Sequence, residues 1–346
     1  MTGYVVGSYQ AVDGLVRLEG DAVTARVDIP TPTWVLAHPT LPVVYAVSEG
    51  VDQSLHTVST AGGELRRVAS APTGGDEGCH VAFDPSGRYL VVSYYGTGTL
   101  TTHAIGDDGV ATAPVDTWML PGVEAAYLTG DPARLVPIDR AWYASGPPEG
   151  PLGLGSRAHQ AVVDGDEMLV ADLGADMVHR VRIGEDGAIA VAAPPILLPV
   201  GSGPRHLVVV GDALVVDCEV SGDLWTTRRS GDGWAADGTS VRAAGGGVET
   251  HPSDLFADGD LVYVGNRGPS TIGVFRVTPE GIAAVAEIPS GGDRPRMITS
   301  LDGQLWIANQ GSGEIAVVDR VAPDDYRLAR KIPGLASPTC IVRARD

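Results

Sequence analysis

The stretch PRHLVVVGDALVVDCEV, residues 204–220, holds the two-part unit from which most of the chain is built. A short β-rich run begins at Pro204, and a second, apolar run ends in the polar cluster Asp217-Cys218-Glu219. Short apolar runs separated by turns predict an all-β protein. Runs of the first kind begin at seven places: Pro32, Gly78, His159, Pro204, Pro252, Pro295 and Pro338.

The spacing of the second runs predicts the architecture. Their ends can be marked at Ser48, Ser93, Asp172, Asp217, Gly265 and Ala308, which lie 45, 79, 45, 48 and 43 residues apart. A period near 45 residues with this strand content is typical of the four-stranded blade of a β-propeller. The one long spacing contains a Pro-, Gly- and Ala-rich segment, which we interpret as an insertion at about 114–151. This segment could be a lid over a site or a solvated loop, and its length favours the lid.

The two ends of the chain carry complementary parts of one unit. The seventh first-type run, at Pro338, stops where the chain stops, and residues 4–9 at the start supply the missing second run. Pairing of these segments would close the ring and remove its open edges. The sequence therefore predicts one domain over residues 1–346, a seven-bladed β-propeller closed by its N- and C-terminal strands. A ring that closes its own edges favours a monomer.

The composition excludes several classes of partner. With 43 acidic and 24 basic residues, the net charge of −19 opposes binding to nucleic acid or to an anionic membrane. Three widely spaced cysteines, Cys79, Cys218 and Cys340, do not form a disulfide framework. The N-terminus lacks a basic segment followed by an apolar stretch, and no run of about 18 apolar residues occurs. We expect a cytoplasmic protein.

The blade topology predicts where a site lies. In an antiparallel blade, the start of the innermost strand and the end of the next strand meet at one mouth of the central channel. The candidate residues at these places are Glu49, His80, Tyr95, His159, Asp172, Arg205, His206, Glu219, Arg267, Arg296 and Gln310. Three arginines on an otherwise acidic protein suit a small anionic ligand, because arginine recognises carboxylate or phosphate with two parallel hydrogen bonds.

Each candidate also has a structural interpretation. Arg205 and Arg296 could pair with neighbouring carboxylates and tie blades together, and Asp172 could cap a turn. His206 is expected to be structural, because it follows Arg205 on a strand and neighbouring side chains point to opposite faces. For His159 we favour a role in the site, and His80 could serve either purpose.

No metal or serine-nucleophile motif is present. The chain has no His-x-His, His-Glu-x-x-His or calcium-loop spacing, and no Gly-x-Ser-x-Gly elbow. We therefore expect neither a metal nor another cofactor.

Several strings specific to single blades resemble the seven-bladed propeller lactonase family, which includes propeller-type 6-phosphogluconolactonases and fungal carboxy-cis,cis-muconate cyclases. The resemblance spans nearly the whole chain. It rests on ADLGADMV at 171–178, GSGPRHL at 201–207, PSD at 252–254 with YVGNRG at 263–268, and RPR at 294–296 with IANQ at 307–310.

The resemblance implies a metal-free site for lactone chemistry with His159, Arg205, Glu219 and Arg267 as catalytic residues. We assign substrate binding to Glu49, His80, Tyr95, Asp172, Arg296 and Gln310. Two strings depart from the family pattern: Cys218-Glu219-Val220 stands for Asn-Glu-Leu, and Arg157-Ala158-His159 stands for a His-Pro-His run.

Opening a lactone needs a base for the attacking water, a charge for the oxyanion and a proton for the leaving alkoxide. Glu219 or His159 could be the base, with the other assisting the leaving oxygen and the arginines holding the oxyanion or an anionic substrate group. The expected function is hydrolysis of a sugar-acid lactone such as 6-phosphogluconolactone. Alternatives are a lactonising cyclase or a related reaction on an anionic small molecule, and a propeller that only binds.

Overall fold

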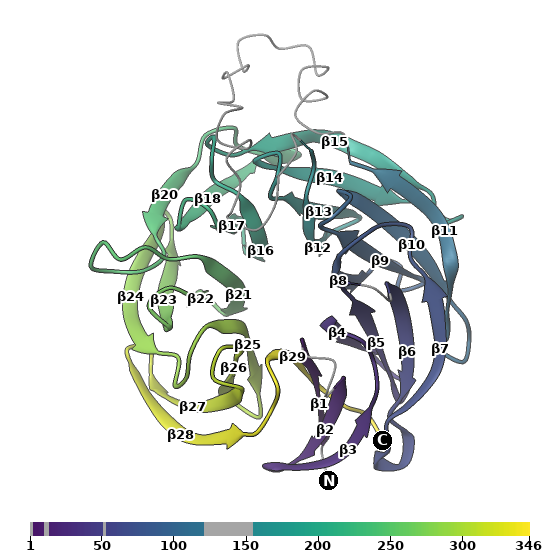
Figure 1. The fold of residues 1–346 in the computed structure, drawn as a ribbon. Coiled ribbons are helices and arrows are strands. Elements are labelled where there is room, and N and C mark those ends of the chain that lie inside the picture. Colours follow the sequence, from purple (N-terminus) through teal and green to yellow (C-terminus); the bar gives the residue numbers. More distant parts are fainter. Residues whose placement is uncertain (1–2, 10–13, 51–52, 121–154) are drawn as a thin grey trace.

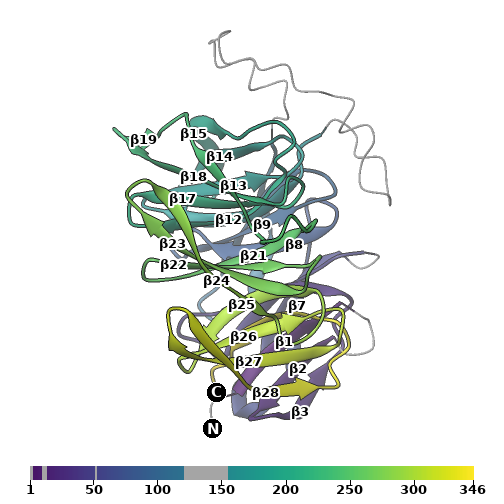
Figure 2. The same cartoon turned by 90° about the vertical axis from the view of Figure 1, so that its left-hand side faces the viewer.

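A computed structural model describes residues 3–9, 14–50, 53–120 and 155–346. Within these ranges seven antiparallel sheets stand around a common axis as the blades of a propeller (Figure 1). Figure 2 views the ring from its edge, where the blades form a thick disc. Apart from one short 3₁₀ turn, η1 (Ala61–Gly63), the regular structure of the described residues is strand. The predicted fold is confirmed.

The strands of each blade follow one another from the axis outward. Blade 1 contains β29 (Pro338–Arg343), β1 (Gly3–Ser8), β2 (Leu15–Glu19) and β3 (Ala22–Val27). Blade 2 contains β4 (Pro32–Ala37), β5 (Val43–Ser48), β6 (Ser54–Ser59) and β7 (Arg66–Pro72). Blade 3 contains β8 (Gly78–Phe83), β9 (Tyr89–Tyr94), β10 (Thr99–Ile105) and β11 (Ala111–Met119). Blade 4 contains β12 (Ala158–Asp164), β13 (Glu167–Asp172), β14 (Met177–Ile183) and β15 (Ile189–Leu197).

The remaining three blades follow the same order. Blade 5 contains β16 (Pro204–Val210), β17 (Ala213–Cys218) and β18 (Asp223–Ser230), which pairs with both β19 (Gly233–Trp234) and β20 (Thr239–Arg242). Blade 6 contains β21 (Pro252–Asp258), β22 (Leu261–Asn266), β23 (Thr271–Thr278) and β24 (Gly281–Pro289). Blade 7 contains β25 (Pro295–Leu301), β26 (Gln304–Asn309), β27 (Glu314–Ala322) and β28 (Asp325–Pro333). All seven runs singled out in the sequence are innermost strands.

The core lies between the blades. Leu169 and Val178 of blade 4 pack with Leu207 and Val216 of blade 5, and all four are fully buried. Each second strand is therefore buried on both faces, whereas an outer strand such as β3 alternates between exposed and half-buried residues. Burial on both faces explains why the second strands have nearly continuous apolar sequences.

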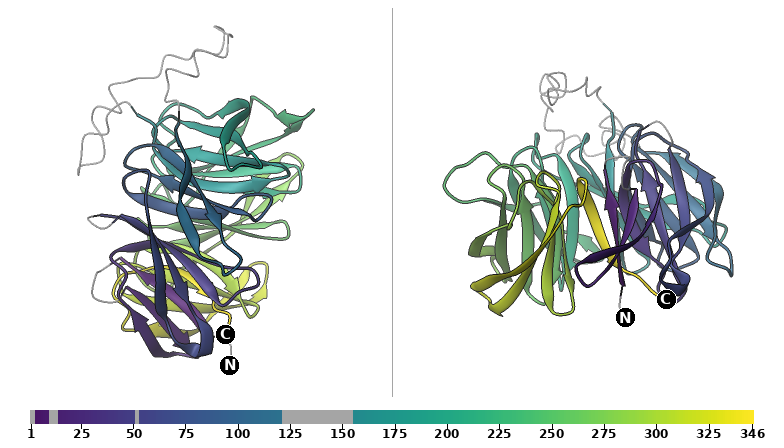
Figure 3. Two further views of the ribbon diagram at one scale, coloured as in Figure 1. Left: turned by 90° about the vertical axis from the view of Figure 1, so that its right-hand side faces the viewer. Right: turned by 60° about the horizontal axis from the view of Figure 1, so that its bottom comes forward.

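Blade 1 joins the two ends of the chain as predicted. Strand β29 pairs antiparallel with β1, and Val5 lies opposite Val342 and Val6 opposite Ile341. Figure 3 shows the two terminal segments side by side. The hydrogen bonds between these strands close the ring.

The first residues of the predicted insertion overlap a strand of blade 3. Residues 114–119 belong to β11, the outer strand of blade 3, where Trp118 pairs with Leu100. Half-buried and exposed residues alternate along this stretch as they do in β3, and Pro114 is tolerated because an outer strand has a free edge. Leu120 follows this strand, and residues 121–151 of the predicted segment lie outside the described residues.

The described ranges hold no helix long and apolar enough to span a membrane.

Candidate active site

One backbone hydrogen bond recurs in every blade and defines a ring of equivalent residues. The residue after each second strand donates its N–H to the carbonyl group of the residue before the innermost strand. Examples are Glu219 to Gly203 at 2.8 Å and Tyr95 to Glu77 at 2.9 Å. The residues in these mouth positions are Tyr9, Glu49, Tyr95, Leu173, Glu219, Arg267 and Gln310.

Five of the predicted site residues occupy mouth positions. Asp172 does not, because Leu173 holds the position in blade 4. The Asp172 carboxylate is fully buried and accepts hydrogen bonds from the N–H of Arg157 at 2.7 Å, from the N–H of Ala175 at 3.1 Å and from the Ser156 hydroxyl. It also pairs with His179 Nε2 at 3.0 Å. These contacts match the alternative in which Asp172 holds a turn.

A β-bulge at the start of each innermost strand sets the direction of the next side chains. In blade 5, Pro204 lies opposite Cys218, but the next paired residue is Leu207, opposite Val216. The extra residue breaks the alternation of side chains. Arg205 and His206 consequently turn to the same side, and Arg205 Nη1 lies 3.2 Å from His206 Nε2. The expectation that these neighbours point to opposite faces is wrong for this reason.

The second residue of each innermost strand has one of two roles. In four blades it is small and ties its blade to the next one, as Thr33 Oγ1 does by donating to the Gly78 carbonyl at 2.7 Å and Ser253 Oγ to that of Pro295 at 2.6 Å. Thr339 and Cys79 make the equivalent bonds to the Pro32 and Ala158 carbonyls. In the other three blades this position carries His159, Arg205 and Arg296.

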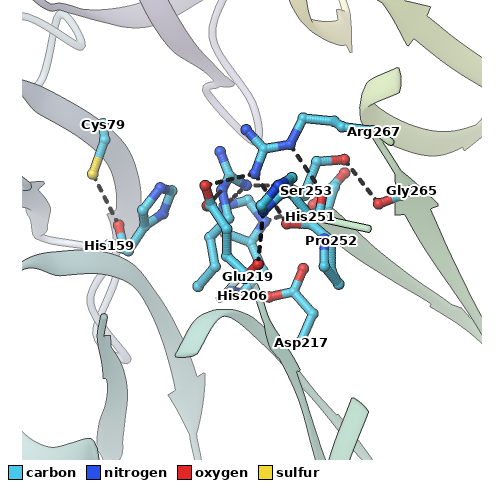
Figure 4. A network of polar contacts seen from close by, with 12 residues as sticks. Cys79, His159, His206, Asp217, Glu219, His251, Pro252, Ser253, Gly265 and Arg267 are labelled. Atoms are coloured by element: carbon cyan, nitrogen blue, oxygen red, sulfur yellow. Dashed lines mark hydrogen bonds and ion pairs between the residues drawn. The ribbon is translucent and has the colours of Figure 1, made fainter. Parts of the chain in front are cut away.

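Glu219 bridges two arginines (Figure 4). Its Oε2 lies 2.9 Å from Arg205 Nε and its Oε1 lies 2.7 Å from Arg267 Nη2. Arg205 also donates to the Ser253 carbonyl, and Arg267 Nε donates to the His251 carbonyl at 3.0 Å. Burial alone would raise the pKa of Glu219, but the charges of Arg267 and Arg205 lower it to about 2. Glu219 is therefore ionised at neutral pH and orients both arginines.

His159 lies beside this cluster. It is 6 % exposed, and within the described part of the chain its Nδ1 has no hydrogen-bond partner. Its ring is 5.1 Å from that of His206 and 6.1 Å from that of Tyr95. Burial, and next the charge of Arg205, lower the pKa of His159 well below its usual value. The ring is thus neutral at pH 7 and can accept a proton.

His80 joins the same group from blade 3. Its ring lies 4.5 Å from that of Trp34 and 6.0 Å from that of His206, and its buried Nδ1 also lacks a partner among the described residues. Burial, followed by the neighbouring His206, lowers the pKa of His80 well below its usual value. The axis of the ring is therefore lined by neutral imidazoles next to fixed arginine charges.

The opposite part of the mouth is formed by hydroxyl and carboxylate groups. Tyr9 donates its hydroxyl to Glu49, and the Arg296 guanidinium lies 4.9 Å from the centre of the Tyr9 ring. Arg157 lies 5.7 Å from the Tyr95 ring centre. The backbone N–H of Gln310 donates to the Arg294 carbonyl oxygen at 3.0 Å. Glu49, Tyr95 and Gln310 thus occupy mouth positions like Glu219, and Arg296 reaches Tyr9 from the start of β25.

Sequence reasoning missed Tyr9 as a site residue and did not consider Asp217 and Asp254. Blade 1 is divided between the two ends of the chain, so the second strand that places Tyr9 lies at the N-terminus, away from the other units. Aligning the ends of all seven second strands would have found it. Among the described residues, no three His, Cys, Asp or Glu side chains are grouped so that they could hold a metal ion.

Comparisons with known proteins place the chain in a family. The family model described as "Lactonase, 7-bladed beta-propeller" matches residues 17–342. A 6-phosphogluconolactonase from Bacillus subtilis is 24 % identical over 92 % of each chain. The solved structure of a putative 6-phosphogluconolactonase from Bacteroides fragilis covers 99 % of this chain and 98 % of its own, with a TM-score of 0.82 at 19 % identity. That of a periplasmic gluconolactonase from Pseudomonas aeruginosa covers 99 % of both chains, with a TM-score of 0.76 at 21 % identity.

The matched region extends from strand β2 to strand β29 and includes every mouth position except Tyr9. The protein belongs to the lactonase family of seven-bladed β-propellers.

Proposed function

We propose that this protein hydrolyses the lactone of an anionic sugar acid, such as 6-phosphogluconolactone, by metal-free acid–base catalysis at the mouth positions. The observation that carries the proposal is a neutral His159, whose Nδ1 has no hydrogen-bond partner among the described residues, beside two arginines that one ionised Glu219 orients. A base and a fixed positive charge within one small site are what ester hydrolysis requires. The family relationship supports the same reaction class.

His159 is the stronger candidate for the general base. Glu219 is held by two arginines with a pKa of about 2, so it has little tendency to take a proton from water. The pKa of His159 is lowered as well, but its Nδ1 has no hydrogen-bond partner among the described residues, whereas both carboxylate oxygens of Glu219 are held by arginines. We assign proton transfer to His159 and the orientation of Arg205 and Arg267 to Glu219.

These residues account for every proton transfer in the hydrolysis. His159 takes a proton from water as the oxygen attacks the lactone carbonyl, and Arg205 stabilises the oxyanion that forms. The bond between the carbonyl carbon and the ring oxygen breaks, and the protonated His159 returns its proton to the leaving alkoxide. The product is the open hydroxy acid, whose carboxylic acid group loses a proton to solvent.

The remaining cations and acceptors suit the rest of the substrate. Arg267 and Arg296 can bind a phosphate or carboxylate group through charge-assisted hydrogen bonds. Glu49, Tyr9, Tyr95 and Gln310 offer acceptors and donors for sugar hydroxyl groups. A polyhydroxy lactone with one anionic group uses both parts of the mouth.

The test is proton release from 6-phosphoglucono-δ-lactone in a lightly buffered, EDTA-treated sample, with spontaneous hydrolysis subtracted. We expect His159→Gln to reduce kcat/KM by about 10²- to 10⁴-fold, the usual contribution of an acid–base group. Glu219→Gln should also lose activity, because Arg205 and Arg267 lose the charge that orients them. Circular dichroism and thermal melting of both variants establish that the fold is retained.

The control is Thr33→Ser, which keeps the inter-blade hydrogen bond at the position equivalent to His159 and should retain activity. Full activity of His159→Gln would refute the assignment of the base. Restoration of an EDTA-sensitive rate by divalent metal would refute the metal-free mechanism. Absence of hydrolysis together with formation of lactone from an anionic hydroxy acid or unsaturated acid would identify the protein as a cyclase.

We further propose that the protein is a monomeric enzyme of carbohydrate metabolism in the cytoplasm. The three cysteines are free and buried, which suits a reducing compartment, and β29 closes the ring without a partner chain. Cell fractionation tests the location, and sedimentation velocity tests the oligomeric state. Recovery of the protein from the periplasm, where the Pseudomonas aeruginosa gluconolactonase is found, would contradict the proposed location.

A further inference from the structure

A chain of three buried side chains runs from the site arginine into blade 6. Arg205 Nη1 lies 3.2 Å from His206 Nε2, and His206 Nδ1 lies 2.7 Å from Asp254 Oδ1. The three residues are 4 %, 1 % and 2 % exposed. None of the steps proposed above uses His206 or Asp254.

The contacts define which ring nitrogen of His206 carries the proton. Arginine has only donors, so His206 Nε2 must accept the hydrogen bond from Arg205. The proton of the neutral ring is then on Nδ1, which donates to Asp254 Oδ1. A second carboxylate, Asp217, accepts the backbone N–H of His206 at 2.6 Å and fixes the start of the strand (Figure 4).

Asp254 has two carboxylate oxygens, but its hydrogen bond to the neighbouring blade uses only one of them. Its Oδ2 accepts the N–H of Ile298 in blade 7 at 2.8 Å. Equivalent ties between other blades are made by Gln160 Oε1, which accepts Leu207 N–H at 2.7 Å, and by Met297 Sδ, which accepts Ile341 N–H at 3.0 Å. A single acceptor atom therefore suffices for this hydrogen bond between blades. The second oxygen of Asp254 is the one that accepts the hydrogen bond from His206.

We propose that Asp254 and His206 are positioning residues that fix the direction of Arg205. In this assignment, which rests on the proposed function, Asp254 selects the Nδ1–H tautomer of His206. His206 Nε2 then holds Arg205 Nη1, and the Nε of Arg205 stays against Glu219. If Asp254 no longer accepted the proton of His206 Nδ1, the ring could carry its proton on Nε2. That N–H would then face the N–H groups of Arg205, and the hydrogen bond between His206 and Arg205 would be lost.

Asp254→Asn is the discriminating variant. Its remaining oxygen keeps the tie to Ile298, while its amide donates to His206 Nδ1 and places the ring proton on Nε2, facing Arg205. We expect kcat/KM to fall about 10- to 100-fold, as for other residues that orient a catalytic group through a hydrogen bond. Thermal stability should change little, because volume and tie are kept.

The direct readout is the tautomer of His206 by ¹⁵N-histidine NMR at pH 8. Burial raises the pKa of Asp254 and that of Asp217 to about 7, so both carboxyl groups are mostly ionised at this pH. Wild type should show the Nδ1–H tautomer and Asp254→Asn the Nε2–H tautomer. The His206→Gln variant identifies the signal by its disappearance.

Gln160→Met is the matched control, because it replaces the equivalent tie by the one that Met297 already makes. It should leave kcat/KM and the His206 signal unchanged. An Nε2–H tautomer in the wild type would overturn the proposal, as would an Asp254→Asn variant with full activity. Equal losses of activity in Asp254→Asn and Gln160→Met would also overturn it. The NMR measurement needs no substrate, so it separates this inference from failure of the proposed lactonase activity.

Discussion

At the scale of single residues, Asp217 is an exception to a repeated pattern. The positions that correspond to it at the ends of the other second strands hold Gly7, Val47, Ser93, Ala171, Gly265 and Ala308. Only one of its carboxylate oxygens has a hydrogen-bond partner among the described residues, and burial raises its pKa to about 7. A raised pKa in the folded state means that ionising Asp217 opposes folding. This cost is absent below the unfolded pKa near 4 and grows until pH 7.

Asp217→Asn should therefore raise the free energy of unfolding, relative to wild type, more at pH 8 than at pH 4. The difference between the variant and wild type in free energy of unfolding should rise by a few kcal/mol between these pH values, since one pKa unit corresponds to about 1.4 kcal/mol. Urea unfolding at both pH values measures it. Asp232→Asn, at an exposed residue, is the control and should show no such rise. A pH-independent difference for Asp217→Asn would contradict the role assigned to burial.

Sequence patterns predicted most of the residues that the structure brings together at the mouth, but not their register. The strand ends identified Glu219 and Arg267, and the strand start at Pro204 identified Arg205, because a charged residue at either end of an apolar run is visible without coordinates. Asp172 was placed in the site because it also ends such a run, yet the mouth position is one residue later. One residue of register moves a side chain from the mouth into the blade.

At the scale of elements, the β-bulge decides which side chains reach the axis. It occurs at the start of each innermost strand, where the pairing register shifts in all seven blades. A bulge has no reliable signature in a single sequence, so the alternation rule predicted the wrong direction for His206. Hydrogen bonds across blades, such as that from Ile298 to Asp254, are likewise invisible until the blades are placed side by side.

Strand β29 makes a further prediction at this scale, because it closes the ring. Ile341 is 1 % exposed, lies opposite Val6 of β1 and packs in the core shared by blades 1, 2 and 7. Ile341→Ala should cost about 2 to 5 kcal/mol of unfolding free energy through lost burial and the cavity left behind. Leu328→Ala, on the outer strand β28 and 51 % exposed, should cost far less. Equal costs for both variants in urea unfolding would contradict a closing role for the β29 contact.

At the scale of the whole molecule, the sequence predicted the number of blades and their closure because both depend on a period repeated over the entire chain. A missing strand in one unit was explained by its presence at the other terminus, and the pairing of β1 with β29 confirms it. Residues 114–119 of the predicted insertion belong to β11, because an outer strand accepts proline at its free edge, although Pro114 suggested a loop. Features with a period are thus predictable, and single interruptions are not.

The charge of the whole molecule opposes the charge at its proposed site. The chain carries a net charge of −19, whereas Arg205, Arg267 and Arg296 meet near the mouth. An anionic lactone approaching at low salt is repelled by the molecule as a whole, since the Debye length is about 30 Å at 0.01 M salt. At 0.15 M it is about 8 Å, which screens the distant acidic groups but not arginines that touch the substrate.

We therefore expect kcat/KM for 6-phosphoglucono-δ-lactone to rise as NaCl increases from about 10 to 150 mM, because screening removes the repulsion and leaves the contacts with arginine. The neutral glucono-δ-lactone should show no such rise, since it feels neither effect at long range. Initial rates of proton release at subsaturating substrate, corrected for spontaneous hydrolysis at each salt concentration, measure both. A fall in kcat/KM confined to the phosphorylated lactone would mean that the mouth arginines, rather than the acidic surface, control its approach.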